Sequence, residues 1–309
     1  MVTDQFFLNS GSTETAGKSL LLTGSRSSST GLIANLIGSF DQVELAYEPP
    51  TLRALFPLIE HMCDQHWRYI FDTFVFEEFL VNALAGRGLN FNSNDDSWAL
   101  RSRGEAEVSR RLSKGHRQVE LAPAAKQVTP LIKLPDVTPY LLAFRRLVPK
   151  HQAIVTIRRP ERAIRTLMET KWLVDERLAG VSADWPNRLL GSPPIPHWVD
   201  TAQVTAWKHW TAEKRCCHYY QQIYKMIPGL KNITVFSIDA FFEKPRTYLA
   251  EFAEARGLSL TEQTEVLLEQ TTDRDGTCTQ ELCIFESERN ELTALHEACL
   301  SVGWTDGEF

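Results

Sequence analysis

The sequence predicts an α/β fold in which a parallel sheet is covered by helices on both faces. Short apolar runs, typical of buried strands, stand at 18–23, 130–135, 152–158 and 232–238. Segments with helical spacing separate them, and strands that alternate with helices indicate a parallel sheet. The 309 residues are 43% hydrophobic, which is enough for a large core.

The elements follow one another in a regular order. After the first apolar run, Leu32, Ile33, Leu36 and Ile37 repeat with the spacing of a helix. The segment at about 50–125 has a mostly helical pattern and predicts a helical insertion. Further helices are expected at 138–149, 160–178, 199–227, 244–258 and 291–304, and the proline-rich segment 183–198 is expected to be a loop. We therefore expect a flexible tail at 1–17 and a single domain at 18–309.

Composition excludes several classes of protein. A net charge of −6 argues against a nucleic-acid binder, and no apolar run is long enough to cross a membrane. The start of the chain lacks the pattern of a signal peptide. The six cysteines form no CxxC pair, and the eight histidines show no metal-ligand spacing. We expect a cytoplasmic protein without a metal, a membrane or a nucleic-acid partner.

A stretch near the start imitates a phosphate-binding motif. "GSTETAGKS", Gly11–Ser19, is similar to a P-loop, which needs Gly-Lys-Ser/Thr between a strand and a helix. The motif also needs a glycine five residues before that Gly-Lys-Ser/Thr. With Gly11 as this first glycine, Ala16 stands at the second glycine position and Gly17 comes one place late, and a strand follows Lys18. The spacing and the context both fail, so we interpret the stretch as part of the polar tail.

The loop after the first strand has the composition of an anion site. "SLLLTGSRSSSTGLIANLIG" places Arg26, Ser27, Ser28, Ser29 and Thr30 between a strand and a helix. Unpaired N–H groups at a helix N-terminus bind anions, and hydroxyls and a guanidinium add further donors. One serine would suffice as a helix cap. Four serines with an arginine favour a site for phosphate or sulfate.

This loop resembles the 5′-phosphosulfate-binding loop of the sulfotransferases, which use 3′-phosphoadenosine-5′-phosphosulfate (PAPS). The family pattern of a basic residue, Ser, Gly, Thr and Thr or Ser is matched by the residues from Arg26 to Thr30, with Ser28 at the glycine position. The resemblance implies that the loop from Ser25 to Thr30 binds the donor. It also implies a P-loop-like three-layer fold with a central parallel sheet.

A second family motif binds the 3′-phosphate. "IVTIRRPERAIRT" is similar to it, with Arg158 at a strand end and Thr166 eight residues later on the next helix. Arg159 replaces the usual Asp. The motif implies that Arg158 and Thr166 bind the 3′-phosphate. In a loop farther along, Arg274 and Gly276 are candidates for the same phosphate, although an ordinary Asp-Gly turn explains them equally well.

Other matches follow in the order of the family, so that the resemblance covers about 18–50 and 130–303. "LIKLP" implies that Lys133 reaches the sulfuryl group, and Asp239 stands at the family's acidic strand-end motif. Arg26 and Lys133 would stabilise the transferred group without a metal. Glu48, in "LAYEPP", is the expected base. A histidine is the rival, with His61 and His116 as candidates, although Pro135 occupies the position where cytosolic members have their histidine.

The resemblance implies a soluble sulfotransferase of the kind that modifies natural products. It would transfer a sulfuryl group from PAPS to a hydroxyl or amine of a small-molecule acceptor and release PAP, the desulfated donor. Two alternatives stay open. A P-loop-like kinase would need a Lys-Ser/Thr pair that the loop lacks, and a non-catalytic nucleotide-binding protein would bind PAP without transfer.

Overall fold

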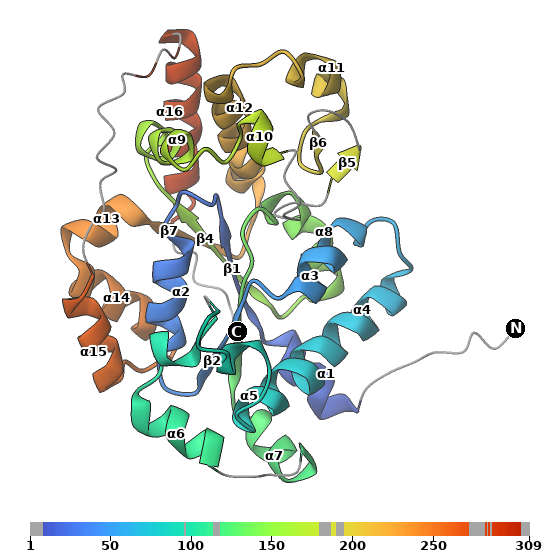
Figure 1. Cartoon of the computed structure of the whole chain (residues 1–309), viewed down its shortest axis with the longest axis vertical. Helices are drawn as coiled ribbons and strands as arrows, with labels where there is room; N and C mark the ends of the chain where they lie inside the picture. The colour runs from blue at the N-terminus through green and yellow to red at the C-terminus, as the bar shows by residue number, and fades with distance from the viewer. Residues whose placement is uncertain are drawn as a thin grey trace, which may run out of the picture.

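A five-stranded parallel sheet forms the centre of the molecule (Figure 1). The computed structural model describes residues 9–95, 97–113, 118–178, 187–189, 195–271, 282, 284 and 286–303. The strand order is β2-β3-β1-β4-β7, and every neighbouring pair is parallel. The strands are β1 Leu20–Gly24, β2 Val43–Tyr47, β3 Thr129–Lys133, β4 Gln152–Ile157 and β7 Ile233–Ser237. Together with the helices on its faces, this sheet confirms the predicted fold class.

Helices connect these strands, and a short antiparallel pair lies outside the sheet. The pair is β5 Asn187–Leu189 and β6 Ile195–Pro196. The helices are α1 Ser10–Gly17, α2 Thr30–Gly38, α3 Pro50–Leu55, α4 Asp64–Thr73, the π-helix η2 Phe74–Val81, α5 Asn82–Leu84, α6 Glu105–Ser113, α7 Gln118–Ala125, α8 Leu141–Leu147, α9 Pro160–Glu169, α10 Asp175–Leu178, α11 Val204–Trp207, α12 Ala212–Tyr224, α13 Ile238–Glu243, α14 Pro245–Glu254, α15 Glu262–Glu269 and α16 Glu286–Leu300. Single 3₁₀ turns are η1 Phe56–Leu58, η3 Leu89–Phe91, η4 Ala99–Arg101, η5 Thr138–Tyr140, η6 Thr201–Gln203 and η7 Ile227–Gly229.

Two hydrophobic cores lie on opposite faces of the sheet. Successive side chains of a strand point to opposite faces, so Leu20 and Leu22 of β1 enter the core shared with α2, α14 and α15. Leu21 enters the larger core shared with α4, α8, α12 and the π-helix η2. Because β1 is covered on both sides, all of its residues are buried, which explains its unbroken apolar run.

The structure corrects several expectations for individual elements. Residues 10–17, expected as part of a flexible tail, form α1, which packs against α4 and η2. The helix expected at 160–178 ends at Glu169, and Lys171 then adopts a left-handed φ of 53°. The helix expected at 199–227 is divided into α11 and α12. Strand β2 was not expected, because the buried Glu44 interrupts its apolar run.

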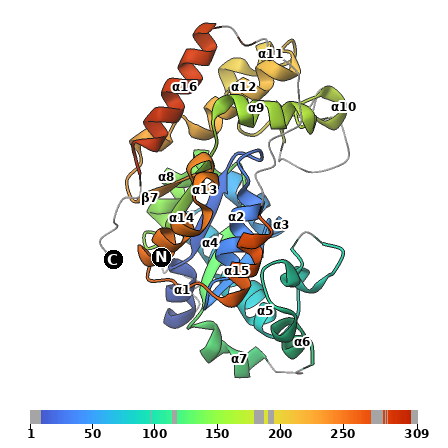
Figure 2. The same ribbon diagram turned by 90° about the vertical axis from the view of Figure 1, so that its left-hand side faces the viewer.

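One end of the molecule carries the helices that matter for the site. In Figures 1 and 2, α9, α10, α12 and α16 gather at one end, and α6 and α7 lie at the other. Contacts from α12 reach Ser25 after β1 and Asp136 after β3, so this end is the one where the parallel strands terminate. Open α/β sheets bind their ligands there.

Candidate active site

The carboxyl ends of the strands bring together most of the residues that the sequence singled out. Ser25 follows β1, Glu48 follows β2 and Lys133 ends β3. Arg158 follows β4, and Asp239 lies just after β7. Electrostatic interactions join Arg26, Lys133 and Glu48 to one another. The three residues expected to perform the chemistry therefore share one site.

The serine loop presents N–H groups at the start of α2. The N–H of Ser28 donates to the carbonyl of Ser25 at 3.0 Å, which closes a turn. Ser29 then takes a left-handed φ of 53° and precedes the helix. The N–H groups of Ser27, Ser29 and Thr30 have no acceptor among the described residues. With the helix dipole behind them, these three donors have the chemistry that suits an anion.

The serine hydroxyls of the loop do not all face a ligand. Ser28 Oγ donates to the carbonyl of Ser25 at 2.6 Å and lies 2.8 Å from Thr156 Oγ1. Ser28 is fully buried, so its side chain joins the loop to β4 instead of pointing outward. Ser25 Oγ and Ser27 Oγ lie 3.1 Å apart. The structure thus assigns Ser28 a packing role that differs from the contact expected for its hydroxyl.

Arg26 is the cation of the loop, and it is held on two sides. Its Nε lies 2.7 Å from Asp136 Oδ2, and the centre of the Trp172 ring is 4.7 Å from its guanidinium carbon. Burial lowers the pKa of Arg26, but the interactions with Asp136, Tyr219 and Glu48 together outweigh burial, so the pKa is raised. The guanidinium is permanently charged and firmly oriented at the mouth of the loop.

Glu48 lies between two cations. Oε1 accepts a hydrogen bond from Lys133 Nζ, and Oε2 lies 2.8 Å from Arg53 Nη2. Burial raises the pKa of Glu48, but the charges of Lys133, Arg26 and Arg53 outweigh burial, so the pKa is below its ordinary value. The Glu48 N–H also donates to the Lys133 carbonyl at 2.9 Å. The carboxylate is therefore ionised at neutral pH and fixed beside β3.

Lys133 is the buried partner of this carboxylate. Its Nζ lies 4.2 Å from the centre of the Tyr47 ring, and the residue is only 3% exposed. Burial lowers the pKa of Lys133, and the attraction of Glu48 offsets that effect in part. A buried ammonium needs such a partner, because an isolated charge is costly in a medium of low polarity.

Backbone strain concentrates at the same edge of the sheet. Six non-glycine residues of the described chain have a positive φ, and three of them are Ser29, Glu48 and Asp136, at 53°, 47° and 67°. L-residues adopt this conformation at a cost, which a surrounding structure tolerates mainly at functional sites. The side chains of two of these residues, Glu48 and Asp136, contact Lys133 and Arg26, respectively.

The expected 3′-phosphate residues occupy the neighbouring strand end. Arg158 is 4% exposed and its carbonyl accepts from Tyr220 at 3.0 Å. Thr166 Oγ1 donates to the carbonyl of Arg162 at 3.0 Å, one turn earlier in α9. Since a hydroxyl has one proton, Thr166 must rotate before it can donate to a phosphate. Asp239 accepts the N–H of Arg159 at 2.8 Å and thereby closes the start of α9.

Sequence reasoning missed three residues of the site, namely Asp136, Tyr219 and Tyr224. Asp136 is 2% exposed, and both tyrosines are fully buried on α12. Tyrosines on a helix are ordinary core residues, so their pattern carries no functional signal. The Asp that follows the Lys-x-Pro of β3 was a signal that could have been used, because it stands at a strand end next to Lys133.

Other candidates lie elsewhere. Arg274, Gly276 and His116 fall outside the described residues. His61 is exposed after η1. "GSTETAGKS" forms α1 before the first strand, and Lys18 pairs with Glu14 of that helix at 2.8 Å, so it is not a phosphate loop.

Within the described ranges, no group of three or more His, Cys, Asp or Glu residues is arranged for a metal. The same part of the chain holds no helix that is long and apolar enough to span a membrane.

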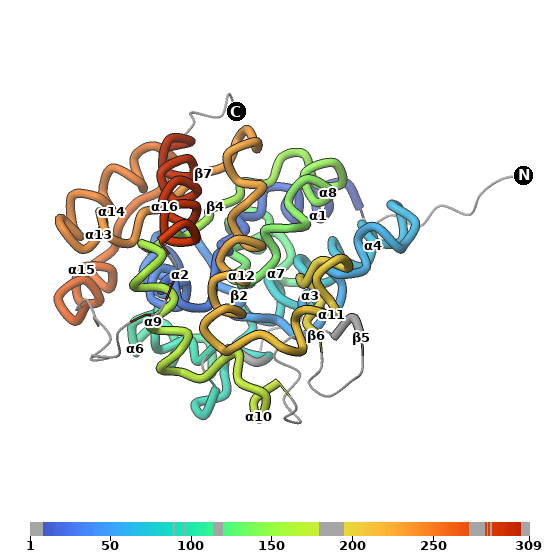
Figure 3. Tube along the Cα trace, turned by 90° about the horizontal axis from the view of Figure 1, so that it is seen from above, coloured from blue at the N-terminus to red at the C-terminus, as the bar shows by residue number. Residues whose placement is uncertain are grey.

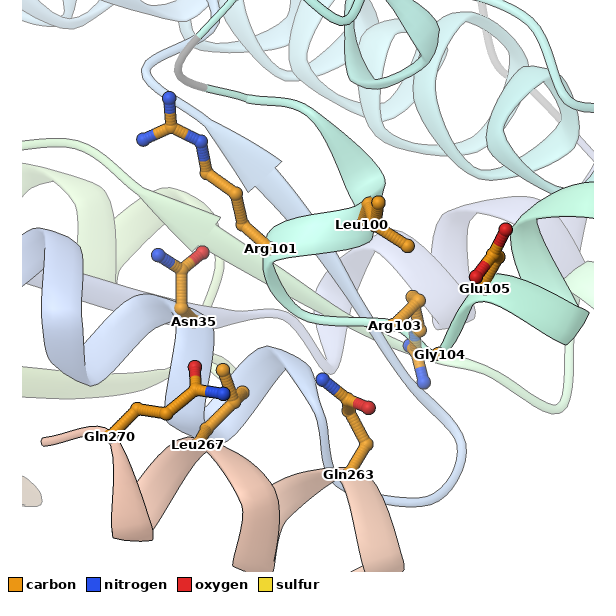
Figure 4. A pocket seen from close by; sticks show the side chains of 9 residues that line it. All are labelled: Asn35, Leu100, Arg101, Arg103, Gly104, Glu105, Gln263, Leu267 and Gln270. Carbon is orange, nitrogen blue, oxygen red and sulfur yellow. The ribbon is translucent and has the colours of Figure 1, made fainter.

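A pocket of about 590 Å³ lies beside the middle of α2, away from the strand ends. Side chains from α2, the η4 turn, the start of α6 and the exposed face of α15 surround it (Figure 4). Its lining is Asn35, Leu100, Arg101, Arg103, Gly104, Glu105, Gln263, Leu267 and Gln270. Arg103 pairs with the buried Glu44 of β2 at 3.3 Å, so one residue of this pocket joins the segment between β2 and β3 to the sheet.

No family model matches the chain, and no curated protein matches it. Similar solved structures include the sulfotransferase domain from the Synechococcus PCC 7002 olefin synthase, which is 10% identical with a TM-score of 0.48 and covers 90% of this chain and 93% of that one. The sulfotransferase domain from the curacin biosynthetic pathway is 10% identical with a TM-score of 0.43, covering 92% and 96%. Sulfotransferase STF1 from Mycobacterium tuberculosis H37Rv is 12% identical with a TM-score of 0.41, covering 90% and 76%.

Proposed function

We propose that this chain is a sulfotransferase that transfers a sulfuryl group from PAPS to a hydroxyl or amine of a small-molecule acceptor. The observation that supports the proposal is that two features lie side by side at one edge of the sheet. The first is the set of N–H donors of Ser27, Ser29 and Thr30 at the start of α2. The second is the Arg26, Lys133 and Glu48 cluster beside it.

The donor is proposed to bind along the strand ends. The loop N–H groups and Arg26 suit the 5′-phosphosulfate, because amides and a guanidinium both donate to phosphate and sulfate oxygens. Arg158, buried at the end of β4, suits the 3′-phosphate. An arginine there would neutralise a group that distinguishes PAPS from other adenine nucleotides.

When bound, PAPS supplies a sulfuryl group whose transfer breaks the S–O bond to the 5′-phosphate while a bond forms from the acceptor to sulfur. Arg26 and Lys133 provide positive charge for the oxygens that gain negative charge during this exchange. Both cations are preorganised by carboxylates and aromatic rings, so they need little rearrangement. Transfer of this type depends mainly on positioning and on charge stabilisation.

Glu48 is proposed to accept the proton that the acceptor loses. Its lowered pKa keeps it ionised at neutral pH, as a base must be. Lys133 holds Oε1 in this structure. We infer that Lys133 turns toward the sulfuryl oxygens when the donor binds, which releases Oε1 for the acceptor. Arg53 would still hold Oε2 and so keep the carboxylate oriented.

The proposal is tested by incubating the purified chain with labelled PAPS and a panel of phenols, sugars and amines, followed by detection of sulfated products. With an acceptor in hand, Glu48→Gln should lose about 10²- to 10⁴-fold in kcat, because the amide cannot take the proton. Its affinity for PAP, measured by calorimetry, should stay within a few-fold of the native value.

A histidine variant provides the control. His116→Ala should keep the native turnover, since the proposed base is Glu48. Normal turnover by Glu48→Gln together with an inactive His116→Ala would refute the assignment of Glu48 and leave the donor site standing. Failure of the native chain to bind PAP at all would refute the proposed function itself.

A further inference from the structure

We propose that Asp136 and Tyr219 are positioning residues that act through Arg26 and hold it in the geometry required for sulfuryl transfer. The inference rests on the proposed function, since it assigns a role to two residues outside the loop. Asp136 directly follows the Lys-x-Pro of β3, and Tyr219 lies on α12, so neither residue belongs to the loop itself. Their position beside Arg26 follows only from the folded structure.

Together these two side chains hold Arg26 by both its main chain and its side chain. Tyr219 OH accepts the N–H of Arg26 at 2.9 Å and donates to Asp136 Oδ1. Asp136 Oδ2 lies 2.7 Å from Arg26 Nε. The three residues therefore form a closed ring of hydrogen bonds, in which Asp136 joins the tyrosine to the guanidinium. Fixing both ends of a long side chain reduces its freedom before any ligand binds.

The protonation states suit this arrangement. Burial raises the pKa of Tyr219 well above its ordinary value, and the charge of Asp136 adds to the effect. Tyr219 is thus a neutral phenol that can donate to the carboxylate and accept from the amide at the same time. A charged group held by such bonds in a buried setting is oriented more strongly than it would be in water.

The backbone of Asp136 is arranged for the same purpose. Its N–H donates to the carbonyl of Gly24 at 3.1 Å, which joins the turn after β3 to the end of β1. Its φ of 67° lies in the left-handed region, which is uncommon for a residue other than glycine. The carboxylate of this turn residue contacts Arg26 of the loop after β1.

Helix α12 carries three tyrosines, Tyr219, Tyr220 and Tyr224, whose hydroxyls reach the strand ends. Tyr224 OH accepts the N–H of Ser25 at 3.1 Å and donates to the carbonyl of Thr156 at 2.9 Å, whereas Tyr220 OH donates to the carbonyl of Arg158. Figures 1 and 2 show α12 at the end of the molecule where these strands terminate, and Figure 3 shows it from above. Tyr219 is the one whose hydroxyl bonds to Arg26 and to a carboxylate that holds the guanidinium.

A double-mutant cycle separates positioning from simple stabilisation. The variants are Asp136→Asn and Tyr219→Phe, each made in the native chain and in Arg26→Ala, and the measurement is PAP affinity by calorimetry in EDTA. Asn tolerates the left-handed backbone, and Phe keeps the ring packing, so both should fold. Tyr248→Phe is the matched control, because its hydroxyl accepts the N–H of Ser237 at 3.0 Å at the end of β7.

In the native background, Asp136→Asn should weaken PAP binding about 10- to 100-fold, as expected for loss of a hydrogen bond to a charged group. Tyr219→Phe should weaken it less, and Tyr248→Phe should leave it unchanged. In the Arg26→Ala background, the added substitutions Asp136→Asn and Tyr219→Phe should have almost no further effect on PAP affinity, because their partner is gone. A structural role alone would give the same loss in both backgrounds.

The possible results distinguish the two proposals. In one case the native chain binds PAP, and the two substitutions weaken that binding equally in both backgrounds, or in neither. Either result overturns the positioning role and leaves the sulfotransferase proposal intact. Absence of PAP binding by the native chain overturns the proposed function. If Asp136→Asn does not fold, the cycle with Tyr219→Phe decides, since coupling to Arg26 is expected there as well.

Discussion

Single residues at the strand ends bear unusual constraints, and Gly24 shows this most clearly. It ends β1 with a φ of 140°, and a Cβ at this position would lie 2.4 Å from the carbonyl oxygen of Thr156. Backbone atoms of a neighbouring strand cannot move aside easily. The close approach of β1 and β4 therefore depends on glycine, and the serine loop begins directly after it.

Gly24→Ala is expected to destabilise the chain by about 2–4 kcal/mol, through strain in β1 and its displacement from β4. Chemical denaturation measures this change. Gly257→Ala is the matched control, because Gly257 also has a positive φ, of 60°, but a Cβ there would meet nothing within 4 Å. Equal losses in the two variants would show that φ alone matters and that the contact with Thr156 does not.

Arg158 gives a second test at this scale. Arg158→Ala should weaken the binding of PAP much more than that of adenosine 5′-phosphosulfate, which lacks the 3′-phosphate. The loss is expected to be about 1.5–3 kcal/mol for PAP, as for a hydrogen bond to a charged group. Calorimetry with both ligands decides the matter, and equal weakening of the two would place Arg158 away from the 3′-phosphate.

The residues of the site divide into those that the sequence could reveal and those that it could not. The loop from Ser25 to Thr30 is contiguous, so its composition alone indicated an anion site. Asp136 stands at a strand end next to Lys133 and could have been noticed there, but its contact with Arg26, 110 positions away, appears only in the folded chain. Tyr219 lies 193 positions from Arg26 and is likewise brought to it only by folding. No local pattern marks a tyrosine as the partner of a distant loop, because a buried tyrosine is most often part of a core.

At the scale of elements, sequence patterns located most strands and helices but not all of their boundaries. Strand β2 escaped notice because Glu44 interrupts it, and the reason appears only in the fold, where Arg111 of α6 lies 3.0 Å from that carboxylate. Helix α1 escaped notice because its residues are polar. It is held by Arg68 of α4, whose Nη2 donates to the carbonyl of Thr13 at 3.2 Å.

The attachment of α1 and α4 should depend on pH through Asp72, which accepts from Arg68 Nε at 2.6 Å. Burial raises the pKa of Asp72 from 3.8 to about 6. Since the folded state holds this proton more tightly than the unfolded state, the contribution of Asp72 to stability falls as pH rises from 4 to 6. The loss amounts to about 3 kcal/mol at most.

Asp72→Asn removes this titration, so its free energy of unfolding relative to the native chain should increase between pH 4 and pH 7. Denaturant melts of both proteins across this range provide the measurement.

Glu107→Gln is the control, and its stability relative to the native chain should change with pH in the opposite direction. Hydrogen bonds from Arg110, followed by those from Arg111, lower the pKa of Glu107 to about 2. That carboxylate stabilises the fold above its ordinary pKa of 4.5 and loses its effect as pH falls toward 2. A flat difference for Asp72→Asn would contradict the account of α1.

At the scale of the whole molecule, the sequence indicated the parallel sheet because strands and helices alternate, but it could not supply the order of the strands. That order, with β1 between β3 and β4, places Arg26, Lys133 and Arg158 on three adjacent strand ends. The chain thus brings three cations from segments far apart in sequence to adjacent strand ends. Carboxylates at Glu48 and Asp136 hold two of these cations, Lys133 and Arg26, in place before a ligand arrives.

The thermal stability of the native chain with PAP in EDTA tests the proposed donor site directly. At a hundredfold excess over the Kd, ligand binding should stabilise the fold by about 2.7 kcal/mol. For a chain of this size, the melting temperature should rise by roughly 5 °C. ATP with Mg²⁺ should give a smaller rise, since ATP lacks the 3′-phosphate that Arg158 is proposed to bind. No rise with PAP, together with a rise with ATP and Mg²⁺, would contradict the sulfotransferase proposal and favour a kinase.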